Sequence, residues 1–127
     1  MVINVGRMKN GEYQAVQQEI AAVKRAVGDH ILKVIIETCL LTDREKEILC
    51  DLVPEAGADF IKTSTGFSTG GATFGDVELF RRCARGRCAI KAAGGISTRE
   101  DMERFLDLGA QRLGTSRAVR ILTGGQK

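Results

Sequence analysis

Short apolar runs alternate with amphipathic helical stretches along this 127-residue chain, and that alternation limits what the chain can fold into. The runs lack the polar–apolar alternation of a half-exposed strand, so they predict parallel strands covered on both faces. The expected strands are Val2–Val5, Leu32–Glu37, Asp59–Thr63, Cys88–Ala92 and Arg112–Thr115. Because strands that alternate with helices connect through right-handed crossovers, the sequence predicts an α/β fold with a parallel sheet.

Helical periodicity and capping signals define the stretches between these strands. Residues 13–27 carry an apolar stripe, and Thr42 and Ser97 each stand three positions before a glutamate, which is the capping-box pattern. Pro54 removes a helical hydrogen bond, which predicts a kink near the end of the second helix. The expected helices are Tyr13–Val27, Thr42 to Gly57, Asp76–Ala84, Ser97–Leu108 with Met102, Phe105 and Leu106 buried, and a short helix after Ser116.

The number of units is about half of what a closed barrel needs. A (β/α)8 barrel has about 250 residues, whereas this chain has 127 and begins within an expected strand. The helix exits at 55–60 and 107–112 resemble each other, as the units of a barrel often do. An open five-stranded sheet is the alternative. In either case we expect a single domain over residues 1–127.

Composition argues against nucleic-acid, metal and membrane partners. The net charge is +3, and basic residues are interleaved with acidic ones, so no basic block is available for nucleic acid. The spacing of Cys39, Cys50, Cys83 and Cys88 matches no zinc pattern, and the sequence has no secretory leader or membrane-spanning run. We therefore expect free thiols, no metal and a cytoplasmic location.

Two lysines interrupt the apolar strands. Lys62 and Lys91 each lie near the end of an expected strand, followed closely by small residues and glycine. An ammonium group is costly to remove from water, so lysine is uncommon in a buried strand. Each lysine alone could simply extend its charge to solvent. The pair favours amine chemistry at the carboxyl ends of neighbouring strands, where barrel enzymes place catalytic groups.

Four strings of residues resemble the deoxyribose-phosphate aldolases, a family of class I aldolases with a TIM-barrel fold. The strings are Met1–Gly6, Lys33–Thr38, Glu55–Phe67 and Ile90–Ile96, and the resemblance extends from Met1 to about Ile121. The Lys-Thr-Ser-Thr-Gly string at 62–66 is the most specific of them. The resemblance implies alternating βα units of a (β/α)8 barrel, truncated at the N-terminus to about five strands.

The resemblance also implies a reaction. It makes Lys62 the Schiff-base lysine and Lys91 the neighbour that tunes it, since a second ammonium and desolvation both favour a neutral amine. The implied activity is that of a lyase of deoxyribonucleotide catabolism, the reversible cleavage of 2-deoxy-D-ribose 5-phosphate to glyceraldehyde 3-phosphate and acetaldehyde. No metal or organic cofactor is implied, because the lysine itself provides the electron sink.

Glycine-rich turns are the expected site for the substrate phosphate. Backbone amides ahead of helices bind anions, and the last two strands of such barrels commonly hold phosphate. The resemblance points to the same segments, with a contribution from the loop after Lys62. A tight turn is the alternative for any one glycine. The expected phosphate-binding residues are Gly66, Gly94, Gly95, Gly114 and Ser116.

Two departures from the family pattern affect these expectations. Family members continue Gly-Thr-Ser with a second serine, where this chain has Arg117, whose charge could also bind phosphate. A catalytic aspartate of the family lies on the strand before the string that begins here at Met1, and its loss alone would lower the rate by about 10²–10⁴-fold. Glu37 is the nearest acidic candidate, and we expect it to serve as structural support.

Three readings of function remain open at this point. The first is an aldolase acting on a small sugar phosphate. The second is a non-catalytic fragment that binds sugar phosphate, or that assembles with itself or with a complementary N-terminal piece. The third is another Schiff-base barrel of the transaldolase type, which the Lys-Thr-Ser-Thr-Gly string disfavours. Because a partial barrel has exposed strand edges, we expect a homo-oligomer.

Overall fold

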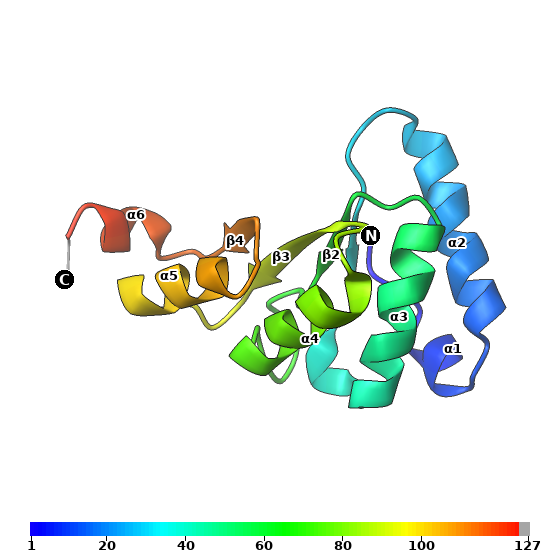
Figure 1. Ribbon diagram of the computed structural model, residues 1–127, viewed down its shortest axis with the longest axis horizontal. Helices are drawn as coiled ribbons and strands as arrows, with labels where there is room; N and C mark the ends of the chain where they lie inside the picture. The colour runs from blue at the N-terminus through cyan, green and yellow to red at the C-terminus, as the bar shows by residue number, and fades with distance from the viewer. Residues whose placement is uncertain (125–127) are drawn as a thin grey trace.

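A four-stranded parallel sheet in the order β1-β2-β3-β4 forms the centre of the computed structural model, which describes residues 1–124 (Figure 1). The strands are β1 (Lys33–Ile35), β2 (Phe60–Lys62), β3 (Ala89–Ala93) and β4 (Arg112–Gly114). The helices are α1 (Val5–Lys9), α2 (Tyr13–Val27), α3 (Asp43–Glu55), α4 (Phe74–Ala84), α5 (Arg99–Asp107) and α6 (Ala118–Leu122), with a 3-10 turn, η1, at Thr38–Leu40. This arrangement confirms the predicted α/β class and the parallel sheet.

The expected first strand is the main correction to the predicted fold. Val2 makes only an isolated bridge to Ile35, so the described residues contain four strands and one bridge instead of about five strands. The side chain of Asn4 accepts a hydrogen bond from the amide of Arg7, which makes Asn4 an N-cap and starts α1 at Val5. The apolar residues Val2, Ile3 and Val5 on either side of Asn4 do not reveal this cap, because they favour a strand.

The other helix boundaries follow local signals closely. The first expected helix matches α2, and Thr42 forms the predicted capping box with Glu45 at the start of α3. The cap of α5 differs: Thr98, not Ser97, accepts the amide of Asp101. Leu106, predicted to be buried, is about half exposed, because the residue of α5 that reaches the core is Phe105.

Pro54 lies in the last turn of α3, which continues to Glu55. Proline lacks an amide hydrogen, so the carbonyl of Cys50, four residues earlier, loses its helical partner. The guanidinium of Arg87 donates to that carbonyl at 3.4 Å and also pairs with Asp51. A side chain from the turn before β3 therefore satisfies the carbonyl that Pro54 leaves free.

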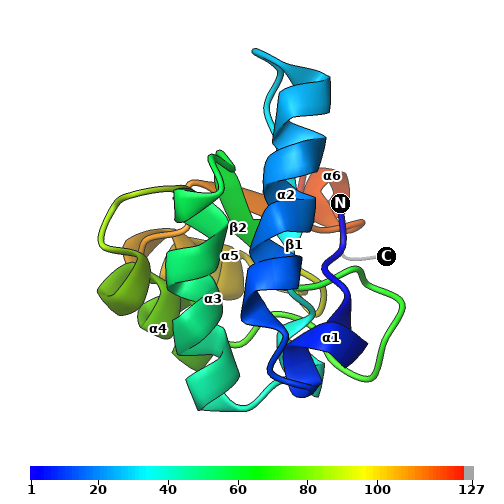
Figure 2. The same ribbon diagram turned by 90° about the vertical axis from the view of Figure 1, so that its right-hand side faces the viewer.

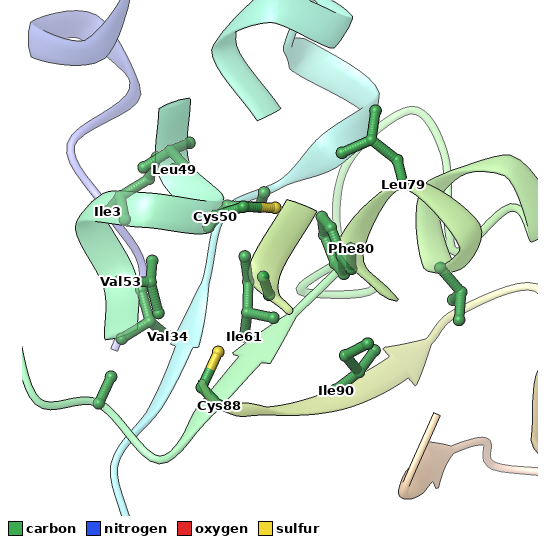
Figure 3. Close-up of a cluster of buried hydrophobic side chains, with 14 of the residues drawn as sticks. Ile3, Val34, Leu49, Cys50, Val53, Ile61, Leu79, Phe80, Cys88 and Ile90 are labelled. Carbon is green, nitrogen blue, oxygen red and sulfur yellow. The ribbon is translucent and has the colours of Figure 1, made fainter. Parts of the chain in front are cut away.

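The helices cover one face of the sheet in chain order. In Figure 2, α2 and α3 stand side by side in front of the strands, and α3 contacts α4 in turn. Figure 3 shows Val34, Ile61 and Ile90 of the strands pointing toward the helices. They meet a set of buried side chains that includes Leu49, Cys50, Val53, Leu79 and Phe80. This face is the hydrophobic core, and the functional side chains must lie on the other face or at the strand ends.

A nearly buried ion pair connects α3 to the start of α4. The amine of Lys46 lies 2.8 Å from the carboxylate of Asp76, and these two side chains are 12% and 8% exposed. Lys46 also pairs with Asp43 at 3.4 Å, but the side chain of Asp43 is 81% exposed. Burial alone would lower the pKa of Lys46, and the hydrogen bonds and charges of Asp76 and Asp43 outweigh it and raise that pKa.

We expect Asp76→Ala to lower the free energy of unfolding by about 2–4 kcal/mol, because it leaves the buried ammonium of Lys46 without its main partner. Asp43→Ala is the matched control, and its loss should stay below about 0.5 kcal/mol because that carboxylate is exposed. Urea unfolding followed by circular dichroism measures both. Equal effects of the two substitutions would contradict this assignment.

Candidate active site

Lys62 and Lys91 occupy paired positions on neighbouring strands. The register of β2 and β3 aligns Lys62 with Lys91 directly. Their chain neighbours Ile61 and Ile90 are buried against the helices, so side-chain alternation directs both lysines to the opposite face of the sheet. Both lysines are partly exposed. The structure therefore brings together the two residues that were predicted to carry the chemistry.

The face of the sheet opposite the helices, called the inner face below, is strongly positive. Lys33 lies on the same face as the two lysines, because its neighbour Val34 on β1 points into the core. Arg112 of β4 stands opposite Lys91 of β3 in the register of the two strands. The guanidinium of Arg112 lies 4.8 Å from the ring centre of Phe60, and the amine of Lys33 lies 5.8 Å from the same ring. Within residues 1–124, neither Lys62 nor Lys91 forms an ion pair with a carboxylate.

The surroundings of Lys91 lower the pKa of its amine. Burial lowers the pKa of Lys91, and the positive charges of Lys62, Lys33 and Arg112 lower it further. Both effects disfavour an ammonium ion, the first by removing water and the second by repulsion. Lys91 is therefore more readily deprotonated near neutral pH than an ordinary lysine.

A pocket of about 410 Å³ opens at the carboxyl ends of β2, β3 and β4. It is lined by six of the seven predicted site residues, namely Lys62, Gly66, Gly94, Gly95, Gly114 and Ser116, together with Thr65, Ala93, Ile96, Thr115 and Arg117. Lys91 does not line it, but pairs with Lys62 beside it. The carboxyl ends of parallel strands are where α/β folds place their ligands.

Three of the predicted phosphate-binding residues in this pocket have backbone amides without a partner within residues 1–124. Among the described residues, no hydrogen-bond acceptor is found for the amides of Gly66, Gly95 and Ser116. Gly66 and Gly95 have φ of 89° and 74°, a left-handed conformation that favours glycine. Gly94 differs, because its amide already donates to the carbonyl of Gly114 at 3.3 Å. Residues with unpaired amides from three separate turns thus line one pocket, and unpaired amides suit an anion.

Gly114 leaves room for the side chain of Lys91. A Cβ atom at this position would lie 3.3 Å from Cε of Lys91 and 3.0 Å from Cβ of Ala93. Both distances are tighter than ordinary van der Waals contacts between carbon atoms. A glycine here thus lets the Lys91 chain pass across β4.

The glycine-rich loop between β2 and α4 is fixed at its middle. A Cβ atom on Gly71 would lie 2.5 Å from the carbonyl carbon of Gly94, so the two backbones touch only because both residues are glycines. The amide of Ala72 donates to the carbonyls of Ala93 and Gly94 at 3.0 and 3.1 Å. The loop is thereby held against the exit of β3, next to the pocket.

Sequence reasoning missed several contacts around the pocket. The hydroxyl of Thr115 donates to the carbonyl of Ile96 at 2.8 Å and accepts the amide of Arg117 at 3.1 Å, which links the exits of β3 and β4. Arg117 also borders a second hollow of about 560 Å³ beside α5 and α6. Glu37 holds Thr65 through two hydrogen bonds. The residue types alone carry no signal for these long-range pairings.

Several other sequence expectations concern cysteines, metals and membranes. All four cysteines are free, as expected. Burial, with the neighbouring thiols, raises the pKa of Cys50 to about 12. Within the described part of the chain, no three His, Cys, Asp or Glu side chains gather as metal ligands would. None of the helices over residues 1–124 has both the length and the hydropathy to cross a membrane.

The parallel βα units and the pocket at the strand ends define the class: this is part of a TIM-type α/β barrel of the aldolase kind. The chain belongs to the DeoC/LacD aldolase family, whose sequence model matches residues 1–122. This finding confirms the family and the fold that the sequence predicted.

Individual relatives agree with this assignment. The chain is 57% identical over 124 residues to a deoxyribose-phosphate aldolase of Clostridium botulinum (strain Eklund 17B / Type B), covering 98% of this chain and 56% of that protein. It is 52% identical over 126 residues to the corresponding protein of Brevibacillus brevis (strain 47 / JCM 6285 / NBRC 100599), covering 99% of this chain and 57% of that protein. The chain thus spans about half the length of the curated relatives it matches.

Solved structures show the same partial coverage. The aldolase QR15 superposes with a TM-score of 0.92 at 38% identity, covering 97% of this chain and 56% of its own. A tetrameric deoxyribose phosphate aldolase from Aeropyrum pernix has a TM-score of 0.81 at 33% identity, covering 88% and 49% of the two chains. The described fold therefore corresponds to about half of these proteins.

Replacing Lys91 by methionine tests the repulsion on the inner face. A lysine whose pKa is lowered by folding binds its proton less well in the folded state, so it destabilises the fold at neutral pH. We expect Lys91→Met to raise the free energy of unfolding at pH 7 by about 0.5 kcal/mol, the size of a partly exposed charge interaction. The gain should shrink as pH rises from the folded pKa of Lys91 toward about 10.4, the ordinary lysine pKa.

Urea unfolding at pH 7 and pH 10 measures this difference. Lys91→Arg keeps the charge and is the matched control, for which no gain is expected. A gain in the arginine variant equal to that in the methionine variant would show that charge is not the cause.

Proposed function

We propose that this chain carries the Schiff-base machinery of a deoxyribose-phosphate aldolase. The observation that carries the proposal is one pocket lined both by Lys62 and by three predicted phosphate-binding residues whose backbone amides are unpaired among the described residues. An amine and an anion site in one pocket suit an aldehyde that also bears a phosphate. The substrate class is a sugar phosphate, with 2-deoxy-D-ribose 5-phosphate as the first candidate. The similarity to deoxyribose-phosphate aldolases supports this choice.

The chemistry begins with attack of the neutral Lys62 amine on the substrate aldehyde. Loss of water from the carbinolamine at C1 gives a protonated imine. The imine draws the electron pair of the C2–C3 bond as the C3 hydroxyl loses its proton and glyceraldehyde 3-phosphate leaves. The resulting enamine takes up a proton at carbon, and hydrolysis of the imine releases acetaldehyde and restores the amine. Every step is completed with water and protons, so the residues need no further reactant.

Lys91 is assigned to tuning and proton transfer in this scheme. Its lowered pKa brings it closer to the pH at which it would act, and general acid–base groups work best when the two match. Lys62 is assigned as the nucleophile because it lines the pocket, whereas Lys91 lies beside it. The phosphate is assigned to the amides of Gly66, Gly95 and Ser116, with Arg117 at the rim.

Borohydride trapping tests the nucleophile. We expect one adduct per chain when the protein is incubated with acetaldehyde and reduced, located on Lys62 by peptide mapping. Lys62→Arg should abolish it, because a guanidinium is not nucleophilic at neutral pH. Lys33→Arg, which changes another lysine of the same face, is the control and should leave the adduct in place.

The alternative is a non-catalytic chain that binds sugar phosphate. One observation favours it: within residues 1–124, no carboxylate pairs with either site lysine. Absence of any adduct on Lys62, together with retained binding of sugar phosphate, would support this alternative. Labelling scattered over surface lysines would count against an activated amine.

We also propose that the chain self-associates. Among the described strands, β4 pairs only with β3, so its other edge is open. The carbonyl of Gly114 accepts the amide of Gly94, so strand alternation turns Arg112 and Gly114 toward β3 and directs the amide of Leu113 outward. A solved relative is described as tetrameric, which supports assembly in this family.

We expect the chain to sediment as a dimer or larger species at micromolar concentration. Leu113→Pro removes the outward amide without removing a bond to β3, so it should shift the chain toward monomer. Leu113→Ala keeps that amide and is the control. A wild-type chain that sediments as a monomer would contradict self-association.

A further inference from the structure

Glu37 has an unusual backbone conformation at the carboxyl end of β1. Its φ and ψ are 57° and 66°, a left-handed region that residues other than glycine rarely occupy. The amide of Ile36 donates to the carbonyl of Lys62, and the amide of Thr38 donates to the carbonyl of Thr63. From Ile36 to Thr38 the chain after β1 advances by two residues, while the carbonyls that it bonds to, those of Lys62 and Thr63, are only one residue apart. Glu37 is therefore an extra residue, as in a β-bulge.

The carboxylate of Glu37 is buried and holds a single residue. Glu37 is 5% exposed. Its Oε1 accepts the amide of Thr65 at 3.1 Å, and its Oε2 accepts the hydroxyl of Thr65 at 2.6 Å. Within the described residues it forms no ion pair. A residue with a strained backbone and a buried carboxylate therefore holds the loop that follows Lys62. Strained backbone conformations of this kind cluster at functional sites.

The hydrogen bonds of the Thr65 hydroxyl leave one position open. A hydroxyl has one hydrogen to donate and two lone pairs that accept. The hydrogen is donated to Glu37, and one lone pair accepts the amide of Phe67 at 3.1 Å. Because a carboxylate can only accept, it prevents the hydroxyl hydrogen from turning elsewhere. The group that Thr65 can present to the pocket it lines is therefore a fixed acceptor.

We propose that Glu37 is a positioning residue that holds Thr65 as the acceptor for a hydroxyl of the sugar chain. This inference rests on the proposed function for the placement of the ligand. Lys62 marks the carbonyl end and the amide of Gly66 marks the phosphate end, and Thr65 lies between them in the chain. The pair of Glu37 and Thr65, called the clamp below, would select aldehyde phosphates that carry hydroxyls between the carbonyl and the phosphate. Aldehyde phosphates without such hydroxyls would bind less well.

Binding of two ligands without a carbonyl group tests the clamp independently of imine formation. 2-Deoxyribitol 5-phosphate carries the hydroxyls in question, and 5-hydroxypentyl phosphate lacks them while keeping the phosphate and the terminal oxygen. We expect the wild-type chain to bind 2-deoxyribitol 5-phosphate about fivefold more tightly than 5-hydroxypentyl phosphate. This ratio corresponds to the free energy of one neutral hydrogen bond. Titration calorimetry measures the ratio of the two dissociation constants.

Two variants remove the clamp in different ways. Glu37→Gly accepts the left-handed backbone without strain and removes the carboxylate, and Thr65→Val removes the hydroxyl with little change of shape. Both variants should bring the ratio of the two dissociation constants close to one. The affinity for 5-hydroxypentyl phosphate should change less than about twofold, which is less than the loss of one hydrogen bond would cause. Thr65→Ser retains the hydroxyl and should keep most of the preference.

Equal losses for both ligands in these variants would reduce Glu37 to support of the loop and overturn the proposal. Absence of preference, or of any binding, in the wild-type chain would overturn it as well. The trapping experiment reports separately on Lys62. An adduct without ligand preference would leave the aldolase assignment in place, and a preference without an adduct would support the clamp alone.

Discussion

The parallel pairing of β2 with β3 is the constraint on which the site depends. Its register places two ammonium groups on adjacent strands, with no carboxylate paired to either among residues 1–124. Repulsion between partly exposed charges costs at most about 1 kcal/mol. The same strands bury Ile61 and Ile90 against the helices, and each such side chain contributes about 1.5–3 kcal/mol. Core burial therefore outweighs the repulsion, and the fold can hold an arrangement that solvation alone would oppose.

The strand exits are joined to one another without any ligand. The hydroxyl of Thr63 bonds to both the amide and the carbonyl of Ala93, which links β2 to β3. The amide of Gly94 and the hydroxyl of Thr115 link β3 to β4. The pocket walls are therefore fixed by bonds within the protein, and a ligand that enters does not have to order them. Such preorganisation lowers the entropic cost of binding.

Local patterns predicted the elements better than their contacts. The helix at Tyr13–Val27 was recovered because its periodicity and end signals are contained in its own residues. The expected strand at Val2–Val5 is reduced to a parallel bridge at Val2 because Asn4 caps a helix. Leu106 is exposed because few elements pack around α5. The clustering of six predicted site residues follows from a general property of parallel strands, whose carboxyl ends meet. The clamp on Thr65 involves residues 28 positions apart, and no local signal marks that pairing.

Net charge is a poor guide to the field that a phosphorylated ligand would meet here. The sum over the chain is only +3, which by itself says little about partners. Many acidic side chains are paired on the helical side, as Asp51 is with Arg87 and Asp76 with Lys46. The inner face, in contrast, gathers Lys33, Lys62, Lys91 and Arg112. Because the sheet and its core separate this face from Asp51 and Asp76, its positive potential is focused where an anion would approach.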